Sequence, residues 1–230
     1  MRERVAALDW ARIDAELDEQ GVARTGPILT AEECDAVAAL YESEAFRSRI
    51  VMARHGFGSG EYKYFAAPVP DPVAALRTAV YPHAARTAND WAARLGAEAY
   101  PETLEAMLAR CHAAGQTKPT PLLLRYGAGD YNCLHQDLYG AVAFPLQLVV
   151  LLSDPAGFEG GELVLTEQRP RMQSRAEVVT LRQGEGALFA TAERPKRGTK
   201  GDYRVRMRHG VSRLRAGSRM TLGLIFHDAA

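Results

Sequence analysis

The sequence predicts an α+β protein in which N-terminal helices precede a β-sandwich or barrel. The first observation is that helical spacing of apolar residues and helix-start signals lie before residue 120. The second is that short apolar or alternating runs, separated by glycine-containing turns, fill residues 121–230. The third is the composition: 230 residues, 47% hydrophobic and 24% charged, suit a globular protein with a substantial core. We therefore expect one compact domain, in which a helical region with short strands (residues 1–120) packs on a core (residues 121–230).

Four segments of the first half favour helices. Leu8, Ile13 and Leu17 follow helical spacing, and Gly21 ends that pattern. The stretch TAEE, residues 30–33, matches a capping box, in which side chains satisfy the free backbone amides at a helix start. The pair Asp71-Pro72 is a second start signal, with an acceptor side chain followed by proline. These signals predict helices over residues 8–20, from about 31 to 41, over 71–95 and over 101–114.

The second half favours strands. The apolar run 148–152 is typical of a strand buried on both faces. Val205 and Met207 alternate with arginines, which places His209 on the same inward face. The stretch RPKRGTKG, residues 194–201, indicates an exposed loop, and Gly160-Gly161 indicates a turn. In the first half, residues 55–70 predict one or two short strands with loops. The predicted strands of the second half cover residues 121–126, 145–153, 160–167, 177–182, 186–191, 202–214 and 219–227.

Charge and cysteine content narrow the class of protein. The formal net charge is zero, so the molecule as a whole is not built as a polyanion-binding protein. Cys34, Cys111 and Cys133 are too few for a disulfide framework, and we interpret them as reduced thiols, with Cys133 a small buried residue. The N-terminus lacks the apolar run of a signal peptide, and no stretch reaches the roughly 18 apolar residues needed to span a membrane. We expect a cytoplasmic protein without a membrane partner.

One short motif, YNCLHQDLYG at residues 131–140, carries candidate metal ligands. On an extended segment the side chains of His135 and Asp137 project to the same side, so both can reach one ion. A mononuclear iron(II) site uses two histidines and one carboxylate on one face of the metal. The second histidine must come from a distant strand, and His209 is the first candidate because it faces inward. His227, at a strand end, is the weaker candidate.

An arginine follows at a spacing that suits a bound dicarboxylate. Arg219 lies ten residues beyond His209, and a turn at Ala216-Gly217 would fold its strand back beside the His209 strand. Arg219 would then lie roughly 10–14 Å from His209 along the barrel. Its guanidinium suits the far carboxylate of a metal-chelating dicarboxylate, since arginine binds carboxylates bidentately. Arg213 is the alternative in that register.

Taken in order, these motifs resemble the Fe(II)/2-oxoglutarate-dependent dioxygenases, and within them the prolyl 4-hydroxylase-like branch. The resemblance covers about residues 122–227 and rests on RYGAGDYNCLHQD, PLQLVVLLSDPAGFEGGELVL, GEGALFA and HGVSRLRAGSRMTLGLIF. It implies a double-stranded β-helix core of the jelly-roll or cupin type, with the N-terminal helices packed on it. It also implies that His135, Asp137 and His209 bind iron(II), and that Arg219 binds the distal carboxylate of 2-oxoglutarate.

The resemblance extends to neighbouring positions. Tyr126 and Tyr131 match aromatic positions that often line the cosubstrate pocket. Leu151 stands where relatives often have a tyrosine that contacts 2-oxoglutarate, and Tyr126, Tyr131 or Gln147 is expected to replace it. Ascorbate is expected to keep the iron reduced. Tyr139, just after the metal motif, receives no role.

The implied reaction is hydroxylation with 2-oxoglutarate and O2, releasing succinate and CO2, and its substrate stays open. The candidates are a protein or amino-acid side chain, a small molecule, and an alkylated base in nucleic acid that is oxidatively dealkylated. The nucleic-acid hypothesis depends on the basic segment Arg194, Lys196, Arg197 and Lys200 and on the outward Arg204, Arg206 and Arg208. Tyr62, Tyr64 and Arg54 are candidates for a substrate mouth. A hypothesis of another class is a cupin-like protein that binds a metal or ligand without redox chemistry.

Overall fold

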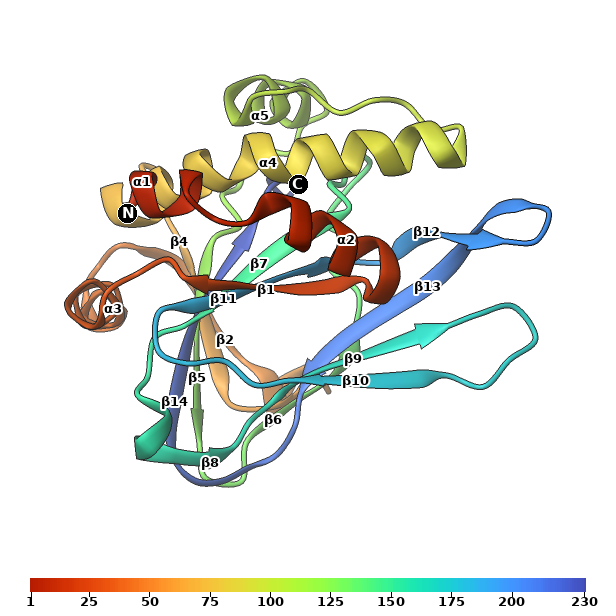
Figure 1. Ribbon diagram of the computed structural model, residues 1–230. Coiled ribbons are helices and arrows are strands. Elements are labelled where there is room, and N and C mark those ends of the chain that lie inside the picture. The colour runs from red at the N-terminus through yellow and green to blue at the C-terminus, as the bar shows by residue number, and fades with distance from the viewer.

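Strands from both halves of the chain form two antiparallel sheets in the computed structural model, which describes residues 1–230 (Figure 1). The large sheet has the order β1 (Val22–Pro27), β11 (Glu185–Ala190), β7 (Leu146–Leu151), β14 (Leu214–Ile225), β5 (Leu122–Gly127), β4 (Glu61–Phe65) and β2 (Phe46–Val51), and β8 (Phe158–Gly160) pairs with β14. The small sheet has the order β10 (Arg175–Val179), β9 (Leu163–Gln168), β13 (Gly201–Val211), β6 (Tyr131–His135) and β3 (Gly58–Ser59), and β12 (Glu193–Gly198) pairs with β13. Side chains of both sheets line one cavity between them. The predicted α+β class and jelly-roll arrangement are confirmed.

Four helices begin and end close to the predicted signals: α2 (Trp10–Gln20), α3 (Ala31–Ala39), α4 (Asp71–Leu95) and α5 (Leu104–Ala113). The short helix α1 (Arg2–Ala6) was not predicted, and 3-10 turns are η1 (Leu40–Glu42), η2 (Met52–Arg54) and η3 (Pro155–Gly157). Thr30 and Glu33 form the expected reciprocal capping box at the start of α3. Gly21 ends α2 in the left-handed conformation, with φ of 79°. None of these helices combines the length and apolar character that crossing a membrane requires.

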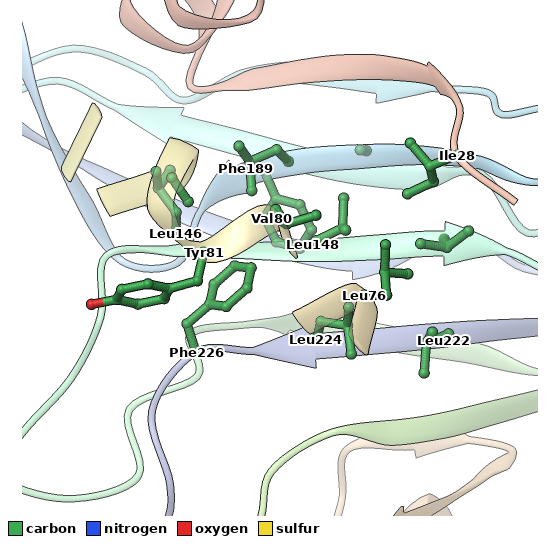
Figure 2. Packing of buried hydrophobic residues seen from close by; sticks show 14 of the residues in the cluster. Ile28, Leu76, Val80, Tyr81, Leu146, Leu148, Phe189, Leu222, Leu224 and Phe226 are labelled. Atoms are coloured by element: carbon green, nitrogen blue, oxygen red, sulfur yellow. The ribbon is translucent and has the colours of Figure 1, made fainter. Parts of the chain in front are cut away.

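The long helix α4 covers the outer face of the large sheet (Figure 1). In Figure 2 its side chains Leu76, Val80 and Tyr81 pack against residues of β7 and β14, among them Leu148 and Leu224. One cluster of 41 buried hydrophobic residues contains these contacts and also residues of α1, α2 and α3. The helical region therefore seals one side of the large sheet, which leaves the other side for the cavity.

Two strand predictions that position the site are correct. Along β13 the buried side chains are Val205, Met207 and His209, as the alternation predicts. In β7, five of the six residues are buried, which agrees with a strand covered on both faces. Gln147 of β7 lines the cavity, while Leu146 lies in the core under α4. The site side of each sheet is thus set by strict alternation along the strands.

Two predictions about the second half are wrong. Residues 194–201 do not form an exposed loop: β12 runs through most of them and pairs with β13. Arg194 is fully buried because its guanidinium is paired with the buried Glu167 and donates to backbone oxygens of α2. The predicted turn at residues 216–217, which would fold Arg219 back beside His209, is absent as well. Arg219 lies on β14, which pairs with β5 and β7 in the large sheet, whereas His209 lies on β13 in the small sheet.

The first half also contributes strands that the sequence patterns did not reveal. Strand β1 pairs with β11, and β2 joins the large sheet through β4. Strands β3 and β4 confirm the short strands expected within residues 55–70, and they join different sheets. Residues before position 120 therefore form edges of both sheets as well as the helical layer.

Candidate metal and cosubstrate site

Pairing between β6 and β13 brings the three predicted metal ligands together. His135 and His209 are register partners on these adjacent strands, with ring centroids 4.3 Å apart. Asp137 follows β6 and places its carboxylate oxygens 3.5 Å from Nε2 of His135 and 3.1 Å from Nε2 of His209. One ligand atom from each residue lies within 4.8 Å of the other two. Two imidazoles and one carboxylate that converge on one side are the donor set of a facial iron(II) site.

Hydrogen bonds orient two of these ligands. The Nδ1 atom of His135 lies 2.8 Å from the carbonyl oxygen of Cys133, so it acts as the donor and leaves Nε2 free for a metal. The hydroxyl of Tyr139 donates to Oδ1 of Asp137 at 2.5 Å, and the hydroxyl of Tyr64 donates to that of Tyr139 at 3.1 Å. Outer hydrogen bonds of this kind fix the orientation of ligand side chains in metal sites.

The charge states also suit a cation. Burial alone would raise the pKa of Asp137, but hydrogen bonds and charge interactions with His135 and His209 hold that pKa well below its usual range. Burial lowers the pKa of His209, so its imidazole is neutral, the form that binds metals. The pKa of the less buried His135 is raised, because interactions with Asp137 outweigh its desolvation. The residues present therefore fit a divalent metal ion.

The triad lies in a cavity of about 360 Å³ whose lining is mostly hydrophobic, and Arg219 is the charged residue at its other wall. Arg219 is 4% exposed, and its buried Nη1 atom has no hydrogen-bond partner. Burial lowers the pKa of this guanidinium, with Tyr126 and Glu162 as the nearest compensating groups. A buried guanidinium without a paired carboxylate is costly, so the cavity is suited to an anionic ligand.

The backbone near Arg219 is shaped to admit that side chain. Gly161 has φ of +68°, and a Cβ atom there would lie 2.8 Å from Cδ of Arg219. On the other side the Tyr126 ring lies 6.0 Å from the guanidinium carbon, and its buried hydroxyl has no partner. Burial raises the pKa of Tyr126, so this hydroxyl is protonated and can donate.

The other predicted site residues divide into two groups. Gln147, Tyr62 and Tyr64 line the cavity, and the amide nitrogen of Gln147 lies 2.9 Å from Nε2 of His209. The side chains of Tyr131, Arg54 and Arg213 are exposed and lie outside that lining.

The structure also places three further residues that the sequence singled out. His227 is fully buried and accepts a hydrogen bond from the backbone of Phe144, and it lies outside the triad. Leu151 is buried and does not line the cavity, whereas Gln147 and Val149 of the same strand do. Cys133 is not a small buried residue: it is exposed and lines the cavity mouth.

Some residues that line the cavity were not predicted from the sequence. Tyr139 contacts the carboxylate of Asp137, and Phe189, Thr221 and Asn132 also line the cavity. Tyr139 had a usable signal, because it follows Asp137 by two positions and carries a polar tip. Phe189 had none, since its ring approaches His209 (4.8 Å between centroids) only through the pairing of β11 with β7.

Comparisons with known proteins identify relatives of this chain. The Oxygenase-NA family, described as oxygenases catalysing oxidative methylation of damaged DNA, matches residues 60–229. Uncharacterised proteins from two strains of Mycobacterium tuberculosis are 50% identical over 168 residues, which is 72% of this chain and 72% of theirs.

Solved structures are similar in fold. A Pseudomonas putida prolyl-4-hydroxylase aligns with a TM-score of 0.52 and 14% identity, over 96% of this chain and 99% of that one. An oxidoreductase of the 2-oxoglutarate–Fe(II) oxygenase family from Burkholderia pseudomallei aligns with a TM-score of 0.57 and 16% identity, over 96% and 92%. The chain therefore belongs to the Oxygenase-NA family of oxygenases, and it has the prolyl 4-hydroxylase-like fold of the 2-oxoglutarate–Fe(II) oxygenases.

Proposed function

We propose that the protein is an Fe(II)- and 2-oxoglutarate-dependent dioxygenase in which His135, Asp137 and His209 bind iron. Arg219 binds the distal carboxylate of 2-oxoglutarate. The observation that carries this proposal is the buried, unpaired Arg219 in the same apolar cavity as a two-histidine, one-carboxylate cluster. A metal at the cluster and a dicarboxylate reaching Arg219 would together satisfy every buried charge of the cavity.

Iron with 2-oxoglutarate and O2 supplies the oxidation, which hydroxylates a C–H bond and releases succinate and CO2. The protein contributes orientation and a dry site. Arg219 fixes the far end of the cosubstrate, and Gln147 of the lining and Tyr126 beside Arg219 offer polar groups to its oxygens. Apolar side chains such as Val149, Leu163 and Phe189 limit water in the cavity. Ascorbate is the reductant that we propose for keeping the iron ferrous.

We propose an alkylated base in nucleic acid as the substrate, with Tyr62 and Tyr64 lining its entry. The support is the family's description, which names damaged DNA. An oxygenase that hydroxylates an N-methyl group yields an N-hydroxymethyl group, which releases formaldehyde and leaves the amine unmethylated. Oxidative demethylation is therefore the chemistry that fits an oxygen-dependent enzyme. A protein side chain or a small molecule is the competing substrate, supported only by a fold shared with prolyl hydroxylases. We further propose that the protein is cytoplasmic, which suits its three free cysteines.

A melting experiment tests the site without turnover. Mn(II) should raise the melting temperature, and N-oxalylglycine, an unreactive mimic of 2-oxoglutarate, should raise it further. Arg219→Ala should keep the response to Mn(II) and lose the response to the mimic. The control is Arg213→Ala, which removes an exposed arginine just before β14 and should respond as the wild type does.

Activity then separates an oxygenase from a cupin-like binding protein. The wild type with Fe(II), O2 and 2-oxoglutarate should form succinate, and His135→Ala or Asp137→Ala should abolish both metal binding and succinate formation. A folded, iron-loaded wild type that forms no succinate with or without methylated DNA would refute the proposal. The same holds if Arg213→Ala, and not Arg219→Ala, abolishes the response to N-oxalylglycine.

A further inference from the structure

A second hollow lies beside the metal cavity. It has a volume of about 410 Å³ and lies between the C-terminal part of α4, the chain around residues 138–145 and the outward face of β13. Gln136 lines both hollows. Its amide nitrogen donates to the backbone oxygens of Ala192 and Met207, so the side chain fills the gap between β6 and β12 along β13. The residue between His135 and Asp137 therefore borders both hollows.

One wall of this hollow is a ladder of arginines. Arg204, Arg206 and Arg208 alternate with the buried residues of β13, so they share its outer face at intervals of about 7 Å. Arg204 is paired with Glu193, the acidic residue of the lining, and donates to the carbonyl of Leu95. Arg206 and Arg208 are exposed and have no acidic partner among the ion pairs of the chain. The hollow therefore carries two uncompensated positive charges.

The opposite wall is mainly hydrophobic. It includes Leu138, which is 56% exposed, and the half-buried ring of Tyr100, while Trp91 is only 2% exposed. A row of guanidinium groups facing apolar and aromatic surface matches a chain that alternates phosphates with flat, apolar faces. No residue of the basic segment before β13 lines this hollow. Within that segment Arg194 is buried against Glu167, and Lys196 lies 3.8 Å from the same carboxylate.

We propose that this arginine groove binds the phosphate backbone of the nucleic-acid strand whose target base enters the metal cavity. The proposal rests on the proposed function and names the surface by which that substrate is held. Arg206 and Arg208 contact successive phosphates, which explains why a neutral protein carries unpaired arginines beside its reaction centre. Gln136 lines both hollows, so a strand in the groove runs beside the metal cavity, into which its target base turns.

The test measures binding of a short, fluorescein-labelled single-stranded oligodeoxynucleotide by anisotropy, with Mn(II) and N-oxalylglycine present. The variant is Arg206→Gln/Arg208→Gln. The matched control is Arg24→Gln/Arg182→Gln, which removes two exposed arginines outside both hollows. Two lost phosphate contacts should make the slope of log affinity against log salt shallower by about 1.4, at about 0.7 per contact, and weaken binding roughly tenfold at low salt. The control should keep the wild-type slope.

The outcomes separate this proposal from the proposed function. The groove variant should form succinate from 2-oxoglutarate without DNA at the wild-type rate, because the metal cavity is untouched. With a methylated oligonucleotide as substrate, the KM of the groove variant for that oligonucleotide should rise, while its kcat stays close to that of the wild type. Unchanged salt slopes in the groove variant, or equal losses in the control, overturn the groove and leave the oxygenase. A polyglutamate peptide that displaces DNA at equal charge also overturns it, since the groove would then bind acidic chains in general.

Discussion

At the scale of single residues, the orientation of Asp137 depends on a tyrosine that the family resemblance does not assign. The Tyr139 hydroxyl donates to Oδ1 of Asp137, while Oδ2 faces His209. A carboxylate held in this way presents one oxygen to the metal and cannot rotate freely. Outer hydrogen bonds to metal ligands typically change metal affinity 10- to 100-fold, so Tyr139 would act as a positioning residue in the proposed metal site.

We therefore expect Tyr139→Phe to weaken Mn(II) or Co(II) binding by roughly tenfold, because the ring packing is kept and only the hydroxyl is lost. Calorimetric titration of the metal-free protein measures this directly. Tyr62→Phe is the control, since that residue lines the same cavity without contacting a metal ligand. Equal affinities for Tyr139→Phe and the wild type would show that packing alone orients Asp137.

His227 makes the stability of the protein depend on pH. It is fully buried, its Nδ1 atom accepts from the Phe144 backbone and its Nε2 atom has no partner. Burial, reinforced by the charge of Arg77, lowers the pKa of His227 from 6.5 to about 4. The unfolded chain therefore binds a proton first as the pH falls, and the folded state loses stability between about pH 6.5 and 4.

The loss from this one group should approach about 3 kcal/mol at pH 4, at 1.36 kcal/mol per pKa unit. Urea unfolding at pH 7 and pH 4.5 measures it by comparing the wild type with His227→Gln. The variant should show a smaller drop in the free energy of unfolding over that interval. His55→Gln, at an exposed histidine, should keep the wild-type drop. Parallel pH profiles for all three proteins would contradict the buried-neutral assignment.

At the scale of elements, the connection from β8 to β9 controls the place of Arg219. Gly161 lies in this connection with φ of +68°, and a Cβ atom there would approach Cδ of Arg219 to 2.8 Å and Cδ1 of Leu214 to 2.9 Å. Gly161→Ala should therefore displace the guanidinium without touching the triad. We expect the 2-oxoglutarate concentration needed for half-maximal succinate formation to rise, while metal affinity stays unchanged.

The control for this substitution is Gly157→Ala, because a Cβ atom at Gly157 would meet no other atom within 4 Å and the residue has no positive φ. It should leave both quantities as in the wild type. If Gly161→Ala binds 2-oxoglutarate normally, Arg219 has another rotamer available, and its position is not set by the glycine turn.

Elements could be predicted from the sequence where local patterns decide them. The capping box of α3 and the alternation of β13 are both local signals. The first gives the start of the helix, and the second places His209 inward correctly. The meeting of His135 with His209 was predictable only because their motif order resembles a family, since 74 positions separate them. Strand β1 and the burial of Arg194 depend on partners far along the chain, so no local pattern could reveal them.

At the scale of the whole molecule, one core joins the helical layer to the sheets. The cluster of 41 buried residues includes Trp10 of α2 and Trp91 of α4, together with sheet residues such as Leu224. The first half of the chain also supplies edge strands to both sheets. No surface divides the helices from the sheets, because each buries its apolar face against the other.

We therefore expect the metal-free protein to unfold in one transition, although its length exceeds the range in which two-state behaviour is usual. Fluorescence of the two tryptophans reports on the helical layer, and circular dichroism near 218 nm reports mainly on the sheets. The two urea curves should coincide. Leu76→Ala removes an α4 side chain that packs on the sheet, and it should lower the free energy of unfolding from both curves equally, by about 2–5 kcal/mol. Loss of tryptophan burial before the sheet signal changes would instead show that residues 1–120 detach as a separate cooperative unit, and that the sheets persist without their helical cover.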